Sequence, residues 1–286
     1  MRIFVTGADG FTGRHFVSAA RAHGHEVIAM RAKLDDKQSM AEQLTLAEPD
    51  AIVHLAAIAF VAHADARAFY DVNVVGTTNL LDVAASLAKR PSAVLLASSA
   101  NIYGNADASP ITEQQPPAPL NHYAMSKLAM EYMARNYLDS LPIIVARPFN
   151  YTGLGQDESF VIPKLVSHFA RRAEAVDLGN LDVEREFNDV RTTCAAYLQL
   201  LQHGVPGECY NICSGNVITL RAVITLLEEL SGHQLDVRVN PAFVRASELR
   251  TLSGSPAKLE AAIGKPDHPG LRQTLQWMLD GYQPDA

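Results

Sequence analysis

Paired cysteines, positive charge and long apolar runs are what this chain of 286 residues has least of. Its three cysteines, Cys194, Cys209 and Cys213, cannot all pair, and extended chain would separate the last two by roughly 13 Å. Neither a disulfide framework nor a zinc site is indicated, because the pairing and the ligand spacing are both missing. We therefore expect buried free thiols, as in a reducing compartment, and no bound metal.

The charge balance is acidic, with a formal net charge of -7 and a pI near 5.8. Such a balance argues against general binding to nucleic acid or to an anionic membrane, but it leaves room for a local basic pocket for one phosphorylated ligand. No apolar run is long enough to span a bilayer, and the first expected strand begins at Arg2, which leaves no room for a signal peptide. We therefore expect a cytoplasmic protein with no nucleic-acid or membrane partner.

Apolar residues, 48% of the chain, follow alternating strand and helix patterns. Strands are expected at 2–6, 25–30, 51–57, 92–98 and 141–147, and helices up to about His23, at 65–89 and around Tyr123. Parallel strands need helical crossovers of this kind. The pattern therefore predicts an α/β fold with a Rossmann-like, doubly wound parallel sheet that helices cover on both faces.

The alternation weakens after Asn150. A helix ending near His203, a strand at 209–213 and helices at 219–230 and 271–279 are expected there. We predict a dinucleotide-binding domain at 1–153, to which the chain returns at about 187–213, and a smaller substrate-binding lobe at 154–286.

Glycines recur every third residue between the first strand and the first helix, at Gly7, Gly10 and Gly13. The spacing differs by one residue from the dinucleotide fingerprint G-x-G-x-x-G, but the physical roles agree: glycine permits the tight turn, and the helix N-terminus faces the pyrophosphate. Ligands of such sheets bind at the carboxyl ends of strands. The residue pairs Ala56-Ala57 and Ser98-Ser99 and the run 147–150 lie at such ends.

The choice of cofactor depends on the end of the second strand, which runs into Arg31. An arginine there accommodates a 2′-phosphate, so NADP(H) is favoured. Arg31 could instead stack on adenine or point outward, which would leave NAD(H) possible as well.

Tyr123 and Lys127 are four residues apart and share one face of a helix. We expect the nearby ammonium to lower the pKa of the tyrosine below its usual value of about 10, which would make it an acid/base group for interconverting a carbinol and a carbonyl. An ordinary amphipathic helix is the alternative explanation of this spacing.

Together these motifs resemble the extended short-chain dehydrogenase/reductase (NAD-dependent epimerase/dehydratase) family, most members of which act on nucleotide sugars. The resemblance runs along nearly the whole chain through Gly7-x-x-Gly10-x-x-Gly13, Asn73-x-x-Gly76-Thr77, Ser99 with Tyr103-Gly104, Tyr123-x-x-x-Lys127, and Arg147-Pro148-Phe149-Asn150-x-x-Gly153. It implies that Ser99 polarises the substrate oxygen, that Tyr123 exchanges the proton and that Lys127 holds the nicotinamide ribose. The implied cofactor-binding residues are Gly7, Gly10, Phe11, Gly13, Arg31, Ala56, Ala57, Asn73, Ser98, Tyr123, Lys127 and Arg147.

The resemblance also narrows the reaction. The 4,6-dehydratases of the family have a carboxylate pair directly after the catalytic serine or threonine, where this chain has Ala100 and Asn101. The epimerase-reductases need a catalytic cysteine and histidine, and none of the three cysteines falls in that stretch. Simple hydride transfer or 4-epimerisation remains.

The second half of the chain, at 146–150, 155–162, 209–215 and 245–250, is similar to the branch of the family that reduces GDP-4-keto-6-deoxy-D-mannose to GDP-D-rhamnose or GDP-6-deoxy-D-talose. In that branch Asn150, Arg185 and Arg245 would bind the diphosphate, and Glu248 would bind the ribose hydroxyls. Arg185 could instead form a salt bridge with Glu184 or Asp189. His122, Leu154 and Thr192 depart from the pattern of the branch, and none of them removes a catalytic group.

The Tyr123 helix is apolar on two sides. Tyr123, Lys127, Met130, Ala134 and Tyr137 share one side, and Met125, Leu128 and Tyr132 lie nearly opposite. We expect the second side to form a homodimer contact, or else to be covered by the second lobe.

Two other functions remain open on the sequence alone. One is a nucleotide-sugar 4-epimerase that keeps NAD tightly bound through its cycle. The other is a non-catalytic dinucleotide sensor, since a fold does not by itself guarantee chemistry.

Overall fold

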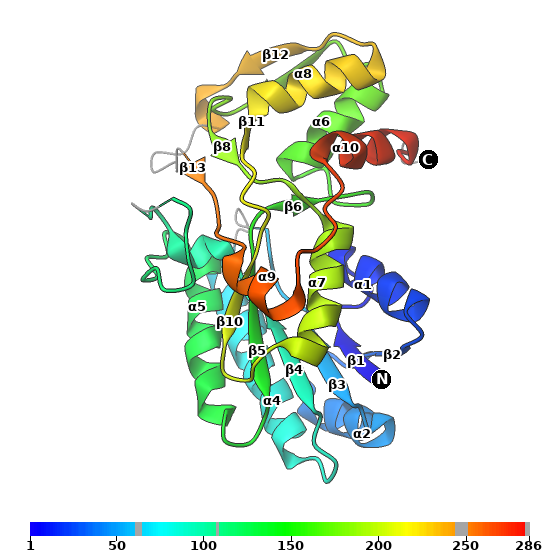
Figure 1. Cartoon of the computed structure of the whole chain (residues 1–286), viewed down its shortest axis with the longest axis vertical. Helices are drawn as coiled ribbons and strands as arrows, with labels where there is room; N and C mark the ends of the chain where they lie inside the picture. The colour runs from blue at the N-terminus through cyan, green and yellow to red at the C-terminus, as the bar shows by residue number, and fades with distance from the viewer. Residues whose placement is uncertain (61–64, 107–108, 244–250, 284–286) are drawn as a thin grey trace.

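The computed structural model describes residues 1–60, 65–106, 109–243 and 251–283. Its main feature is a six-stranded parallel sheet in the order β10-β5-β4-β3-β1-β2 (Figure 1). The strands are β1 (Arg2–Thr6), β2 (Glu26–Ala29), β3 (Ala51–His54), β4 (Ala93–Ala97), β5 (Ile143–Pro148) and β10 (Cys209–Ile212). The four central strands are almost continuously apolar because both of their faces are covered. The prediction of a doubly wound parallel sheet is confirmed.

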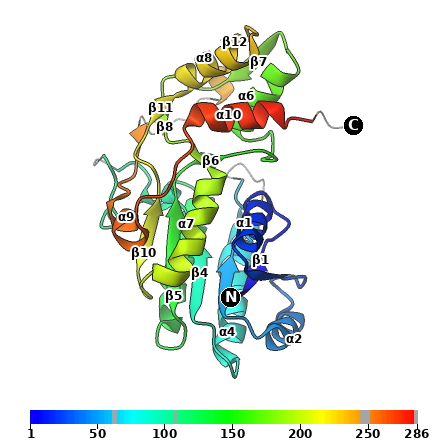
Figure 2. The ribbon, with the colours of Figure 1, turned by 45° about the vertical axis from the view of Figure 1, so that its right-hand side comes forward.

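Helices cover the two faces of the sheet with separate cores. On one face α1 (Phe11–Ala22) and α7 (Val190–His203) pack over a core that includes Ile3 and Val5, as Figure 2 shows. On the other face α2 (Lys37–Ala47), α4 (Thr77–Ser86) and α5 (His122–Ala134) pack over a core that includes Phe4. Alternate residues of a strand point to opposite faces, so β1 supplies both cores.

The chain changes direction across the sheet at β1. From β1 it passes first to β2 on one side and then back to β3 on the other side. Ligands of open α/β sheets bind beyond the carboxyl ends of the strands at such a reversal. The fold therefore predicts a ligand-binding site at the ends of β1 and β3, which are followed by Gly7 and Ala56.

A second lobe lies beyond the carboxyl ends of the sheet, at the top of Figure 1. It contains α6 (Val161–Ala170), β7 (Ala175–Leu178), β8 (Glu184–Arg185), β11 (Ile218–Thr219), α8 (Leu220–Ser231), β12 (Asp236–Val239), β13 (Thr251–Leu252) and α10 (Leu271–Asp280). Buried residues such as Leu165, Val223, Leu227 and Leu275 form its own core. The pairing of β6 (Tyr151–Thr152) with β9 (Asn188–Asp189) lies where the chain passes between the lobes. The chain returns to the sheet through α7 and β10, and again at α9 (Ala257–Ile263), which packs on α7 and β10.

The helix expected at 65–89 is present over 66–86, but it is not a uniform α-helix and it ends earlier than expected. The structure has α3 (Ala66–Tyr70), a π-helical turn η1 (Asp71–Gly76) and then α4, and the helix ends at Ser86. The turn is fixed by tertiary contacts, because the Asn73 side chain holds the backbone of Ile58 on both its N–H and C=O groups. A side-chain carbon at Gly76 would lie 2.8 Å from Cβ of Leu34, so the end of η1 also lies close to the loop before α2.

Helix α2 was not predicted, since only Met40, Leu44 and Ala47 of its residues are buried. Its N-cap was readable, because Asp36 accepts a hydrogen bond from the Ser39 N–H, as Asp at an N-cap commonly does. Within the described residues, no helix is long and apolar enough to cross a bilayer.

Candidate active site

The glycine turn after β1 is shaped by close backbone contacts. Gly7 has φ of +69°, and a Cβ there would lie 2.6 Å from the Ala56 nitrogen at the end of β3. A Cβ at Gly13 would lie 2.0 Å from the Gly7 carbonyl oxygen, so α1 can approach the turn only with glycine at this position. Gly10 is the N-cap of α1 and offers no side-chain cap, which leaves the first N–H groups of the helix for another acceptor.

These features fit the pyrophosphate of a dinucleotide, because an uncapped helix N-terminus beside a glycine turn binds anions. The Phe11 ring is not part of this anion site: it stacks on Tyr151 at 6.1 Å between ring centroids. Its backbone belongs to the first turn of α1, next to the glycine turn. Arg31 lies beyond β2 and its guanidinium approaches the Asp9 carboxylate of the turn at 3.7 Å, so a cation flanks the turn.

Ser99, Tyr123 and Lys127 come together at the carboxyl end of β4. Ser99 caps the short helix η2 (Ala100–Tyr103), and its side chain lies close enough to Tyr123 to influence the pKa of the phenol. Asn121 caps α5 by accepting from the Ala124 N–H at 2.8 Å, which sets the first turn that carries Tyr123. The Lys127 ammonium, one turn later, donates to the Ala97 carbonyl oxygen at 2.7 Å. All three side chains are buried.

The expected lowering of the Tyr123 pKa is wrong for this structure. Burial raises the pKa of Tyr123, and the neighbouring Ser99 side chain offsets part of that effect. Burial also lowers the pKa of Lys127 to about 8, opposed by the negative charge of Glu131. Helical spacing placed Tyr123 and Lys127 one turn apart on α5, but it did not indicate their degree of burial. The phenol is therefore protonated at neutral pH, which suits a proton donor.

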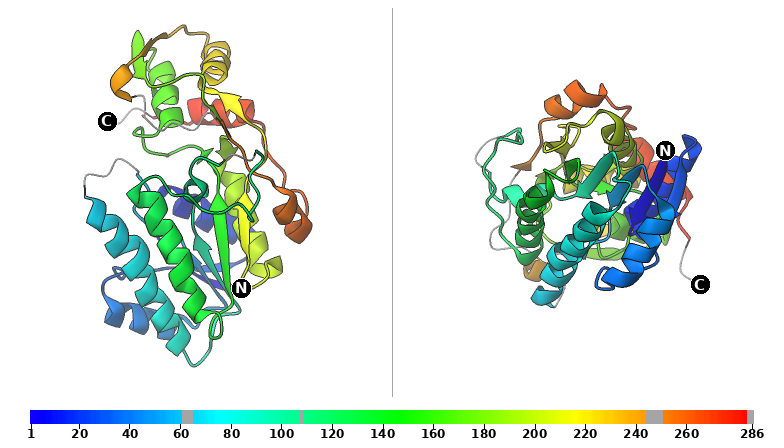
Figure 3. Two further views of the ribbon diagram at one scale, coloured as in Figure 1. Left: turned by 90° about the vertical axis from the view of Figure 1, so that its left-hand side faces the viewer. Right: turned by 90° about the horizontal axis from the view of Figure 1, so that it is seen from below.

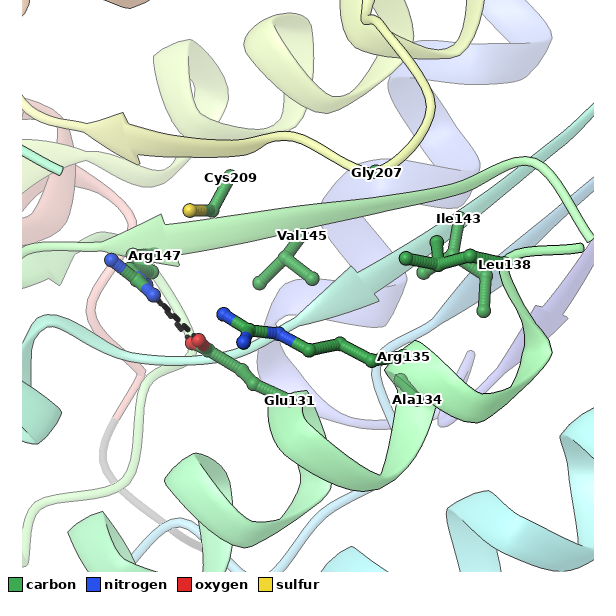
Figure 4. Close-up of a pocket in the computed structure, with 9 residues that line it drawn as sticks. All are labelled: Glu131, Ala134, Arg135, Leu138, Ile143, Val145, Arg147, Gly207 and Cys209. Carbon is green, nitrogen blue, oxygen red and sulfur yellow. Dashed lines mark hydrogen bonds and ion pairs between the residues drawn. The ribbon is translucent and has the colours of Figure 1, made fainter. Parts of the chain in front are cut away.

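Arg147 is engaged inside the protein, contrary to its predicted contact with the cofactor. Its Nε and Nη2 atoms donate to the two carboxylate oxygens of Glu131 at 3.0 and 2.6 Å (Figure 4). Its Nη1 atom donates to the Tyr103 hydroxyl at 2.9 Å. The Ser98 hydroxyl, another predicted cofactor contact, also donates to Glu131. Both side chains thus serve a buried network behind the active site.

Glu131 is the functional neighbour that the sequence reading missed. It follows Lys127 by four residues on α5, so the same helical spacing that paired Tyr123 with Lys127 could have indicated it. Next to its ion pair is a small pocket of about 30 Å³ whose lining includes Glu131, Arg135, Arg147 and Cys209 (Figure 4). The lining does not include Tyr123 or Lys127, so this pocket is not the reaction site.

Asn73, also predicted to contact the cofactor, is fully buried and its amide is satisfied internally. Besides its two bonds to Ile58, its Nδ2 donates to the Ser126 hydroxyl at 2.9 Å. The side chain therefore supports the loop after β3 and the Tyr123 helix.

At Ala56, where a cofactor contact was also expected, the backbone N–H donates to the Thr6 hydroxyl at 3.2 Å. Ala57 follows it in the same loop, beyond the end of β3.

Of the predicted substrate residues, Asn150 lies at the end of the large sheet and Arg185 lies in the second lobe. Asn150 follows β5, and its carbonyl oxygen accepts from the Asn188 backbone at 2.9 Å. Arg185 lies on β8, where its Nη1 donates to the Glu184 carbonyl oxygen at 2.8 Å. Arg245 and Glu248 lie outside the described residues.

The two acids considered as partners of Arg185 have other contacts. The Asp189 carboxylate is bound by Arg191, and the Glu184 carboxylate accepts from the Thr251 hydroxyl at 2.7 Å. His122, one of the departures from the family pattern, is the first residue of α5 and is hydrogen-bonded to the Tyr70 hydroxyl at 3.0 Å.

Comparisons with known proteins agree with this geometry. The model of the NAD dependent epimerase/dehydratase family matches residues 3–213. The chain is 37% identical to a GDP-6-deoxy-D-talose 4-dehydrogenase of Aggregatibacter actinomycetemcomitans over 269 residues, which are 92% of each protein. It is 35% identical to a GDP-6-deoxy-D-mannose reductase of Pseudomonas aeruginosa, over 99% of this chain and 97% of the relative. The solved structure of RMD from Pseudomonas aeruginosa complexed with NADPH superimposes with a TM-score of 0.91 at 34% identity, and covers 98% of each chain.

Proposed function

This chain belongs to the NAD dependent epimerase/dehydratase family and is an NAD(P)-dependent oxidoreductase, and from that premise we propose that it reduces the C4 ketone of a nucleotide-linked 4-keto-6-deoxyhexose. The observation that carries the proposal is the buried pairing of the Ser99 and Tyr123 hydroxyls, with Lys127 one turn away. A protonated phenol and a second hydroxyl at one point can both donate to a carbonyl oxygen. That is what reduction of a ketone needs as negative charge develops on the oxygen.

In the proposed reaction the C4 carbonyl becomes an alcohol by gaining a hydride on carbon and a proton on oxygen. NADPH, when bound, supplies the hydride. Tyr123 gives its hydroxyl proton to the substrate oxygen, and Ser99 donates a hydrogen bond to the same oxygen. Lys127 stabilises the phenolate that Tyr123 becomes and binds the nicotinamide ribose. The turn at Gly7, Gly10 and Gly13 holds the pyrophosphate.

We propose a GDP-linked substrate, GDP-4-keto-6-deoxy-D-mannose, with GDP-D-rhamnose or GDP-6-deoxy-D-talose as the product. The support is the similarity to two GDP-sugar oxidoreductases over nearly their whole lengths. Asn150 and Arg185 would contact the diphosphate, with Arg245 and Glu248 as further substrate contacts. Directly after Ser99 stand Ala100, which is buried, and Asn101, which donates to the Ser99 hydroxyl. Elimination would need an acid and a base at these two positions.

We also propose NADPH as the preferred cofactor, since Arg31 flanks the glycine turn where a 2′-phosphate would lie.

The Tyr123 helix would form a homodimer contact. Met125 and Tyr132 on that helix are 43% and 52% exposed, so the second lobe does not cover them. Helices α4 and α5 lie side by side at this surface (Figure 3). A cytoplasmic location is in keeping with the three free cysteines.

The test is an assay of NADPH oxidation with GDP-4-keto-6-deoxy-D-mannose, with the C4 configuration of the product determined by NMR. The UDP-, dTDP- and CDP-linked ketones serve as comparison substrates. We expect the wild-type protein to turn over the GDP sugar and Tyr123→Phe to be inactive with nearly unchanged NADPH binding. Near-normal turnover by Tyr123→Phe would refute the assignment. Tightly bound NAD in the purified protein, with no need for added NADPH, would favour a 4-epimerase instead.

A further inference from the structure

A buried histidine at the end of β3 has no part in the proposed chemistry. His54 is 1% exposed, and burial lowers its pKa to about 3, helped by the positive charge of Lys127. The imidazole is therefore neutral at any pH at which the protein would work, and it cannot act as a proton carrier there. Its role therefore depends on its two hydrogen bonds, to Thr6 and to Thr77.

The directions of these bonds fix one tautomer. The Thr77 hydroxyl donates to the Asn73 carbonyl oxygen at 2.8 Å, so its oxygen accepts from His54 Nε2, also at 2.8 Å. His54 Nδ1 then accepts from the Thr6 hydroxyl at 2.7 Å, and the Thr6 oxygen accepts from the Ala56 N–H. A neutral imidazole donates from one nitrogen and accepts at the other, as this chain of bonds requires.

The chain of bonds continues from both ends of this set to parts of the active site. On one side Ala56 is the residue against which Gly7 packs, at the nucleotide-binding edge of the sheet. On the other side Asn73 donates to the Ser126 hydroxyl, which donates to the Tyr123 carbonyl oxygen at 2.8 Å. His54 is thus the middle link between the glycine turn and the first turn of the helix that carries the proton donor.

We propose that His54 is a positioning residue whose neutral imidazole holds the nucleotide-binding edge and the Tyr123 helix in register. The two halves of the network have different expected effects: the Thr6 half acts on cofactor binding, and the Thr77 half acts on proton donation. Catalytic groups must be held within fractions of an ångström, so loss of one buried link lowers the rate without unfolding the protein. The inference rests on the proposed reduction for its kinetic readout, and the binding readout is independent of it.

The experiment compares four threonine variants by NADPH fluorescence titration and by kcat for ketone reduction. Thr77→Val should lower kcat roughly tenfold, as expected for one lost buried hydrogen bond, and change the Kd for NADPH less than twofold. Thr77→Ser, which keeps the hydroxyl, should restore most of the rate. Thr6→Val should instead raise the Kd roughly tenfold with a smaller change in kcat.

The matched control is Thr78→Val. Thr78 is the next residue of α4, and its hydroxyl donates to the Val74 carbonyl oxygen at 2.9 Å, outside the network. Both its kcat and its Kd should stay at the wild-type values. Equal losses in Thr77→Val and Thr78→Val would overturn the proposal, because they would show only a general effect of removing a helix hydroxyl.

A His54→Gln variant tests the claim that the imidazole does not transfer protons. Its kcat and Kd should both worsen, while the pH profile of kcat keeps the wild-type shape. Loss of one limb of that profile would make His54 an acid/base group and would refute the positioning role. If the wild-type protein binds NADPH but reduces none of the keto sugars, the proposed function fails, and Thr6→Val against Thr78→Val in the titration still decides the binding half.

Discussion

The ion pair between Arg147 and Glu131 gives the sharpest prediction for stability. Its side chains are 7% and 6% exposed, so solvent screening weakens the interaction little, and the geometry is bidentate. Removing one partner of such a buried pair typically costs about 3–5 kcal/mol, because the remaining charge stays buried without a partner. Arg147→Met and Glu131→Gln should each lose a free energy of unfolding of that order.

The double variant separates the pair from its surroundings. With both charges gone no unpaired ion remains, so Arg147→Met combined with Glu131→Gln should recover part of the loss and give a coupling energy of about 2 kcal/mol or more. Urea denaturation followed by circular dichroism measures all four proteins. Single variants within about 1 kcal/mol of wild type, or losses that simply add, would show that the pair is not a coupled unit.

Three further predictions concern the turn, the cofactor and acid stability. Gly13→Ala should abolish NADPH binding or prevent folding, since its Cβ would lie 2.0 Å from the Gly7 carbonyl oxygen, and fluorescence titration with a thermal melt distinguishes the two results. Arg31→Ala should raise the KM for NADPH roughly tenfold and leave the KM for NADH unchanged, as expected for one lost charge-assisted contact to a phosphate; equal effects on both cofactors would contradict the role. The pKa of His54 is about 3 when folded and 6.5 otherwise, so stability should be complete above pH 6.5 and fall as the pH is lowered toward 3, by about 4–5 kcal/mol in all, and a His54→Gln variant should show a shallower fall in urea titrations.

The sequence predicted features that depend on neighbours along the chain. The turn at Gly7, Gly10 and Gly13 and the spacing of Tyr123 and Lys127 are local patterns, and the alternation of strands and helices implies the parallel sheet through a general rule. Local hydrogen bonding and periodicity determine these features, so one sequence was enough to find them.

Features that depend on long-range contacts were missed or misread. Arg147 and Ser98 were expected at the cofactor, but both bind Glu131, and that contact exists only once β4, β5 and α5 are packed together. The π-helical turn at η1 depends on the bonds of Asn73 to Ile58, a loop fifteen residues earlier in the chain. A hydrophobic pattern contains no information on either partner.

The pKa of Tyr123 shows how burial changes the meaning of a motif. With Lys127 nearby, the spacing suggested a tyrosine that ionises easily, but the phenol and the ammonium are both buried, and burial disfavours the charged form of each. In the resting protein the tyrosine therefore keeps its proton. In the proposed reaction, passing the proton to a substrate oxygen would leave a buried phenolate one helical turn from an ammonium, and the attraction between them would stabilise the state after transfer. The lysine thus favours the product of proton transfer more than the starting state, which is the condition under which a fixed charge accelerates a reaction.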